Sequence, residues 1–74
     1  MPRKIRELLA DLRKAGYRLV KGAGKGSHTK WWHPLVPGTV ILAGKDGDDA
    51  HRYQEDDVRD AIRIAREAEK RQQP

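Results

Sequence analysis

Two apolar stripes with helical spacing, one near each end of a 74-residue chain, most constrain how this sequence folds. Gly16 follows the first stripe, where a glycine commonly ends a helix. The second stripe predicts a helix from near residue 54 to near residue 70. Each helix must cover its apolar face, so the segment between them has to supply a layer for both. The stripes consist of Ile5, Leu8, Leu9 and Leu12, and of Val58, Ala61, Ile62 and Ala65.

Three short segments between the stripes read as strands, at residues 17–21, 29–33 and 39–43. They are rich in β-branched or aromatic residues and are separated by glycine and proline. Short connections favour an antiparallel meander. We therefore predict one domain over residues 1–74 with an α+β fold in the order α-β-β-β-α. Its three-stranded antiparallel sheet has both helices on one face and leaves the other face open.

The residue inventory excludes several classes of site. The chain has no cysteine, which rules out disulfides and cysteine-built zinc sites. The three histidines have spacings that match no common metal-ligand pattern, so we expect neither a metal nor a cofactor. We predict His33, beside a proline at a strand end, and His51, after two aspartates, to lie on the surface. No apolar run spans a membrane or forms a signal peptide, so we expect a cytoplasmic protein with no membrane partner.

The charge is unevenly distributed along the chain. The net charge is +5, with +8 on the first 45 residues and −3 on the remainder. One face should therefore attract a polyanion such as RNA. Arg3, Lys4 and Arg6 begin the first predicted helix, where positive charge is unfavourable. This conflict suggests a use in phosphate binding, although a frayed chain start would also tolerate it.

A glycine-rich basic loop leads directly into the second predicted strand at Lys25, Gly26, Ser27 and His28. Glycines let backbone N–H groups approach an anion closely, and lysine binds phosphate. Histidine can both take and give a proton near neutral pH. These groups suffice to cleave an RNA phosphodiester, with cations steadying the charge on the phosphoryl oxygens. Judged on residue types alone, a structural or surface histidine is the competing interpretation.

Strand alternation divides the second predicted strand into two faces. His28, Lys30 and Trp32 share the more charged face, which we assign to the open side of the sheet, and Trp31 then enters the core. Trp32 would be exposed enough to stack on a base, or it would simply pack at the sheet edge. The opposite parity would bury His28 and remove the site.

An ordered set of landmarks resembles the HicA-type toxins, the mRNA-cleaving halves of HicA–HicB toxin–antitoxin pairs. The resemblance runs from about residue 4 to about residue 65, and the glycine-serine-histidine step is its most specific part. The landmarks are Ile5-Arg6-Glu7-Leu8-Leu9, Lys14-Ala15-Gly16-Tyr17, Gly24-Lys25-Gly26-Ser27-His28, His33-Pro34, the segment 39–45, and the segment 47–55.

The resemblance implies a double-stranded-RNA-binding-domain-like fold, with His28 as the catalytic residue of a ribonuclease that acts on mRNA. It also implies a HicB-type antitoxin that covers this site. The sequence departs from the family at Thr29, where many members carry a basic or aromatic residue. It also departs from duplex-binding domains of this fold, which place lysines where Glu55, Asp56 and Asp57 begin the second predicted helix. Because carboxylates repel phosphates, single-stranded RNA suits the sequence better than a duplex.

We therefore expect a toxin that is a metal-independent endoribonuclease with His28 as general base or acid. Lys25, with the N–H groups of Gly26 and Ser27, would hold the scissile phosphate, and Lys30 would add charge. A non-catalytic RNA-binding module of the same fold would need the basic face but not the histidine. A protein-interaction domain, whose basic face meets an acidic partner, is the third possibility.

Overall fold

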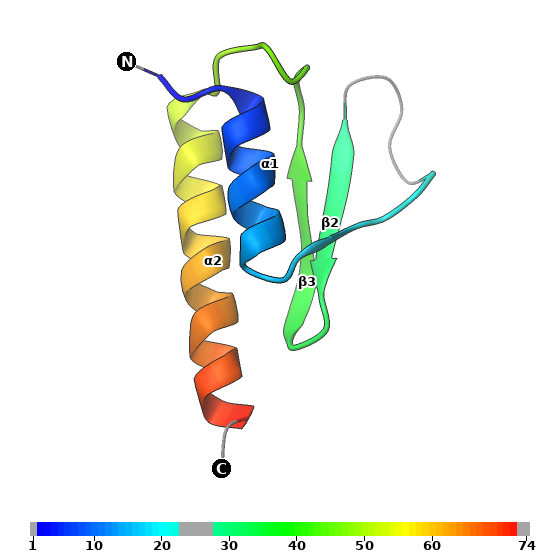
Figure 1. Cartoon of the computed structure of the whole chain (residues 1–74), viewed down its shortest axis with the longest axis vertical. Helices are drawn as coiled ribbons and strands as arrows, with labels where there is room; N and C mark the ends of the chain where they lie inside the picture. Colours follow the sequence, from blue (N-terminus) through cyan, green and yellow to red (C-terminus); the bar gives the residue numbers. More distant parts are fainter. Residues whose placement is uncertain (1, 23–27, 73–74) are drawn as a thin grey trace.

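The computed structural model describes residues 2–22 and 28–72, which form two helices and three strands. The elements follow the order α1 (Ile5–Lys14), β1 (Arg18–Leu19), β2 (Thr29–His33), β3 (Val36–Leu42) and α2 (Arg52–Gln72). The strands form an antiparallel sheet in the order β1-β2-β3. Both helices lie on the same side of this sheet (Figure 1). The predicted α+β fold is thereby confirmed.

The core fills the space between the helix pair and the inner face of the sheet. Trp31 and Leu42 enter it from β2 and β3, and both predicted helical stripes close over them. Burying large aliphatic and aromatic side chains in this way is the main source of stability in a domain of this size. The helical members of the core are Ile5, Leu8, Leu9 and Leu12 from α1, and Val58, Ala61 and Ala65 from α2.

The outer strands have different bounds from those predicted. β1 is only two residues long, because Tyr17 turns inward and its hydroxyl donates a hydrogen bond to the carbonyl of Ala61 (2.8 Å). β3 begins at Val36 rather than at residue 39. It therefore contains Pro37, which an edge strand tolerates because a proline there need not donate to a neighbouring strand.

Helix α2 begins at Arg52, earlier than predicted, because Gln54 organises its first turn. The backbone N–H of His51 donates to Oε1 of Gln54 (2.8 Å), as in the returning half of a capping box. The side-chain amide of Gln54 donates in turn to the carbonyl of Ala43 (2.8 Å), so this buried glutamine ties the helix start to the end of β3. With the helix starting at Arg52, only Glu55 of the predicted acidic trio lies in the first turn.

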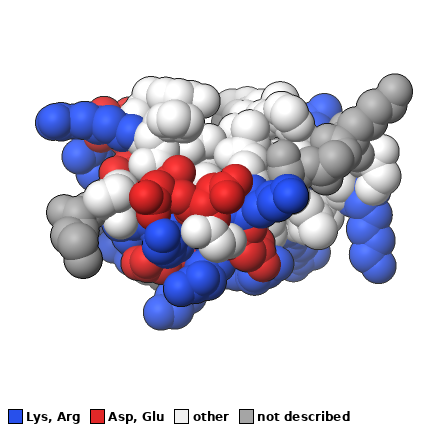
Figure 2. Space-filling model, turned by 90° about the horizontal axis from the view of Figure 1, so that it is seen from above, with Lys and Arg blue, Asp and Glu red and all other residues white. Residues whose placement is uncertain are grey.

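The connection between β3 and α2 caps the beginning of α1. The N–H groups of Ile5 and Arg6 donate to the carbonyls of Asp48 (2.9 Å) and Asp46 (3.1 Å), and Ala50 N–H donates to the carbonyl of Arg3 (2.7 Å). Free N–H groups at a helix start need such acceptors. Seen from this end of the molecule, acidic side chains gather in the middle, while Lys and Arg side chains follow one long side (Figure 2).

Candidate functional site

The two tryptophans of β2 lie on opposite faces of the sheet, as predicted from strand alternation. Trp31 is buried in the core at 1% exposure, whereas Trp32 is 37% exposed on the face without helices. Lys30 shares the parity of Trp32 and is half-buried. Lys30 and Trp32 therefore belong to the side of the sheet that the helices leave uncovered.

His28 is exposed and lies immediately before β2, in the described segment that starts at this residue. Alternation continued by one residue puts its side chain on the same side as Lys30 and Trp32. The parity that would bury His28 is therefore wrong. The remaining predicted site residues, Lys25, Gly26 and Ser27, lie outside the described residues, so their predicted contact with phosphate stays a prediction.

Two further residues, which sequence reasoning did not include, complete this surface. Arg18 of β1 lies opposite Trp32, and its guanidinium carbon stands 5.6 Å from the centre of the Trp32 ring. Ile41 of β3 lies opposite Lys30 and is 62% exposed. Alternation within each strand can put these residues on an outward face, but only the strand registers bring them beside Trp32 and Lys30. We call the surface formed by Arg18, Lys30, Trp32 and Ile41 the open face.

A cation and an aromatic ring side by side give the open face a defined chemistry. A guanidinium near an indole is attracted by the ring electrons, at roughly 0.5–1 kcal/mol when exposed. Guanidinium groups also bind phosphate oxygens, and exposed rings stack on unpaired bases. The open face thus combines groups suited to a single-stranded nucleic acid with His28 at one end of its central strand.

Thr29, one of the departures from the family pattern, faces the core rather than the open face. Its hydroxyl accepts a hydrogen bond from the indole N–H of Trp31 (3.0 Å) and donates to the carbonyl of Leu42 (3.4 Å). A buried indole N–H needs such a partner. The small polar residue here therefore serves the packing of Trp31.

His33 is buried at 4% exposure, and the prediction that it lies on the surface is wrong. Its Nδ1 accepts a hydrogen bond from Leu35 N–H (3.0 Å), so Nε2 carries the proton and donates to the carbonyl of Ala15 (3.1 Å). The ring also packs edge-on against Tyr17, with ring centroids 5.1 Å apart. With both nitrogens bonded inside the fold, His33 fastens the end of α1 to the β2–β3 turn.

His51 is exposed, as predicted, and stacks on the ring of Tyr53 with 5.7 Å between ring centroids. It precedes α2, whereas His28 precedes β2. Across residues 2–22 and 28–72, no group of three or more histidine, aspartate or glutamate side chains could hold a metal ion. His51 is therefore a second exposed histidine that does not belong to the open face.

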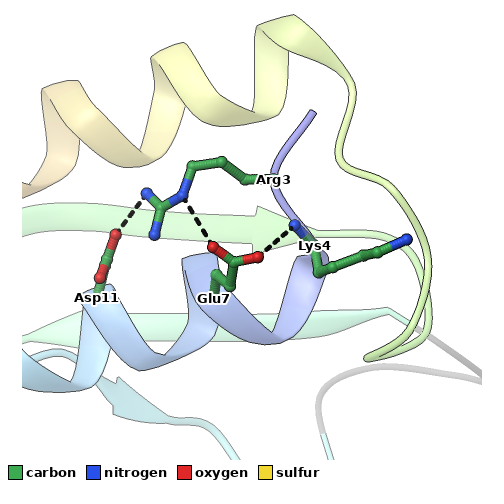
Figure 3. A network of polar contacts seen from close by, with 4 residues as sticks. All are labelled: Arg3, Lys4, Glu7 and Asp11. Carbon is green, nitrogen blue, oxygen red and sulfur yellow. Dashed lines mark hydrogen bonds and ion pairs between the residues drawn. The ribbon is translucent and has the colours of Figure 1, made fainter. Parts of the chain in front are cut away.

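The cations at the start of α1 are held by carboxylates of the same molecule (Figure 3). Arg3 donates to Asp11 (2.6 Å) and lies 3.5 Å from Glu7, while Lys4 Nζ pairs with Asp49. The hydrogen bond to Asp11, helped by the nearby negative charge, raises the pKa of the Arg3 guanidinium above its usual value. Glu7 also accepts from the backbone N–H of Lys4 (3.2 Å). These ion pairs compensate the positive charge of Arg3 and Lys4 at the helix start, so no bound phosphate is needed to explain it.

The family model described as "HicA toxin of bacterial toxin-antitoxin" matches residues 5–68, from the first residue of α1 to well inside α2. The chain belongs to the HicA toxin family. No curated protein and no solved structure matches it. Membership in the HicA family makes this chain a toxin of a toxin–antitoxin system, and it implies an antitoxin as partner.

The family match includes every strand of the sheet and therefore both His28 and the whole open face. No helix within the described parts of this HicA chain is long and apolar enough to cross a membrane.

Proposed function

We propose that this toxin is a metal-independent endoribonuclease that cleaves mRNA, with His28 as its general base or general acid. One observation supports the proposal: an exposed histidine stands immediately before the central strand, and strand alternation puts it on the side of Arg18, Lys30 and Trp32. The family match supports the same assignment, because the histidine lies within the matched region.

The proposed reaction needs one proton acceptor, one proton donor and positive charge near phosphorus. The imidazole removes the proton of a 2′-hydroxyl, the 2′-oxygen forms a bond to phosphorus, and the bond from phosphorus to the 5′-oxygen breaks. The leaving 5′-oxygen takes up a proton. Cations and N–H groups aimed at the phosphoryl oxygens stabilise the charge that develops there. We assign this role to Lys25 with the backbone of Gly26 and Ser27, and a supporting role to Lys30.

The dimensions of a strand suit an RNA chain that runs along the open face. Residues on one face of a strand repeat about every 7 Å, so Lys30 lies about 7 Å and Trp32 about 13 Å along from His28. A base several ångströms from the reacting phosphate could stack on Trp32, and Arg18 beside the ring could hold a phosphate. Lys30 would then contact the backbone between them.

Single-stranded RNA is the proposed substrate. Domains of this fold that grip a duplex present lysines at the start of α2, whereas this chain has Glu55, Asp56 and Asp57 there. Asp56 is paired with Arg59 (3.1 Å), but Asp57 is exposed and would face a phosphate with like charge. A duplex that lies across this end would meet repulsion, and an unpaired strand on the open face avoids it.

The second candidate function is a non-catalytic RNA-binding module. It uses the same open face, and the Arg18–Trp32 pair is the observation that favours it, because stacking and charge suffice for binding. The two functions differ only in whether His28 changes the rate of a reaction. In both, a HicB-type antitoxin is the proposed protein partner.

The test is cleavage of a labelled single-stranded RNA in EDTA by three proteins: wild type, His28→Ala and His51→Ala. We expect His28→Ala to be slower by about 10²–10⁴-fold, the usual contribution of a general acid or base. His51→Ala should cleave as fast as wild type, because the proposed reaction gives this exposed histidine no role. Circular dichroism checks that all three are folded.

Cleavage by a folded His28→Ala protein at the wild-type rate would contradict the proposed mechanism. RNA that is bound by wild type but left intact would favour the binding module. Cleavage that disappears in EDTA and returns with a divalent cation would contradict the metal-independent reaction.

A further inference from the structure

One long edge of the sheet is left without a partner strand. β3 lies at the end of the strand order β1-β2-β3, and within the described residues no further strand pairs with it. The seven residues of β3 carry no charged side chain. Exposed edges are commonly protected by lysines, prolines or bulges, and within the described residues β3 has a proline and a shift in register only near its first residues, at Pro37 and Gly38.

The direction of the backbone hydrogen bonds shows which groups this edge presents. Val20 N–H donates to the carbonyl of Lys30 (2.8 Å), so the backbone of Lys30 points toward β1. Its partner on the other side, Ile41, therefore forms a non-hydrogen-bonded pair with it. The N–H and C=O groups of Ile41, and by the same alternation those of Thr39, point away from β2. They can pair with an added strand.

A groove of about 290 Å³ runs between this edge and α2. Val36 and Val40 line it from the inner face of β3, and Ala61 and Ile64 line it from α2. Ile64 is 38% exposed although it is a large apolar residue. The groove therefore offers apolar contacts beside the free backbone groups, as sites for an added strand do.

Two carboxylates, Asp57 and Asp60, line the α2 side of the same groove. Both are exposed, and neither forms an ion pair with any residue in the described segments. Four of the six cations of α2 line a different groove on the flank that faces α1, where they outnumber Glu55 and Glu67: Arg59, Arg63, Arg66 and Lys70. The two flanks of one helix thus carry opposite charge, and the flank beside the β3 edge is negative.

The free backbone groups, the apolar lining and the two carboxylates together favour one kind of ligand for this groove over others. RNA would bring phosphates to Asp57 and Asp60, and like charges repel. A second copy that paired β3 with β3 would bring no cation, because β3 is uncharged, and would gather four carboxylates around the new sheet. A protein segment with basic side chains would meet both carboxylates and the backbone edge at once.

We infer that an extended segment of the antitoxin, bearing lysine or arginine, adds a strand to the free edge of β3 and sets its basic side chains against Asp57 and Asp60. The inference rests on the antitoxin partner of the proposed function and not on the ribonuclease activity. The groove lies at the edge of the sheet, so docking there leaves the centre of the open face for other contacts.

The first test is amide hydrogen exchange of the whole chain, alone and with the purified antitoxin encoded with it. In the free chain the N–H groups of Thr39 and Ile41 have no partner on the free edge, so they should exchange fast. Pairing with an added strand should slow both by about tenfold or more, since exchange then requires the complex to open. No substituted protein is needed, so a folding defect cannot obscure the result.

The second test compares two variants that make the same charge change on opposite flanks of α2. Asp60→Lys should weaken antitoxin binding by about tenfold or more, because a cation would replace the carboxylate that the partner needs. Glu67→Lys, on the flank that faces α1, should change the affinity by less than about twofold. Isothermal titration calorimetry measures both, and circular dichroism confirms their folding.

Three results would overturn the inference. They are unchanged exchange at Thr39 and Ile41 in the complex, equal affinities for the two variants, or no binding of antitoxin by wild type. If the same amides are protected in a concentrated solution of the chain alone, and sedimentation shows a dimer, then the strand added to β3 comes from a second copy of this chain and not from the antitoxin.

An RNA cleavage assay distinguishes failure of this inference from failure of the proposed function. If the antitoxin protects the edge amides and wild type leaves RNA intact, the docking site stands and the ribonuclease assignment fails.

Discussion

Trp31 and Trp32 are neighbours in the chain, yet they serve opposite faces of the sheet. Trp31 is enclosed, with its indole N–H bonded to Thr29 and the guanidinium of Arg13 5.1 Å from its ring centre. Trp32 stands on the open face at 37% exposure, with the guanidinium of Arg18 5.6 Å from its ring centre. The inner face therefore uses its aromatic residue to hold two helices. The outer face leaves an equally large ring partly exposed, where a ligand can reach it.

The largest expected effect is the difference in stability between variants that remove the tryptophan from each of these two faces. Trp31→Ala should lower the free energy of unfolding by about 3–5 kcal/mol, because it opens a cavity in the core. Trp32→Ala should lower it by less than about 1 kcal/mol, because the ring is partly in water already. Urea denaturation of the two variants measures the difference. Equal losses would show that the open face is part of the structural core.

A second prediction concerns the close contact between Gly16 and His33 on the inner side. Gly16 has φ of +96°, and a Cβ there would lie 2.9 Å from Nε2 of His33. Gly16→Ala should therefore cost about 2 kcal/mol, roughly half from the backbone conformation and half from the contact. In a His33→Ala background the cost should fall to about 1 kcal/mol. A double-mutant cycle in urea measures this coupling, and additive losses would mean that the ring moves aside freely.

The smallest predicted effect concerns the hydroxyl of Tyr17, which is hydrogen-bonded inside the core. Tyr17→Phe should cost about 1 kcal/mol, the usual net value of one hydrogen bond. Burial raises the pKa of Tyr17 above its ordinary value of 10.0, so the unfolded chain loses this proton first. The stability that depends on the neutral hydroxyl is complete below that value and is lost as the pH rises through the raised pKa.

Unfolding free energies of wild type and Tyr17→Phe, measured from about pH 9 to about pH 11, test this sign. The gap between them should shrink as the pH rises. Tyr53→Phe is the control, because it removes the hydroxyl of an exposed tyrosine. A gap for Tyr17→Phe that stays constant across this range would contradict the role of burial.

Local periodicity predicted most of the fold and half of the site. Spacing along the chain sufficed for both helices, for the central strand and for the inward direction of Trp31, because each depends on residues close in sequence. The same alternation put His33 on the inner side, but its position beside Pro34 suggested the surface. Its burial depends on acceptors and donors from Ala15 and Leu35, which only the folded chain brings to both ring nitrogens.

The parts that sequence reasoning missed depend on pairing between strands. Arg18 became part of the open face only through its register opposite Trp32, and that register depends on how a two-residue strand aligns. Likewise, Pro37 and Gly38 read as a turn until β3 is known to be an edge strand. The resemblance to HicA toxins supplied the role of His28, which no spacing within the chain could give.

The contribution of α2 to the core has a consequence for the timing of synthesis. This helix brings Val58, Ala61 and Ala65 against the inner face of the sheet, and it is translated after all three strands. Until it emerges, Trp31 and its neighbours have no complete cover, and small domains fold as whole units. A nascent chain that still lacks α2 should therefore remain unfolded, so the whole sheet waits for the last element to be translated.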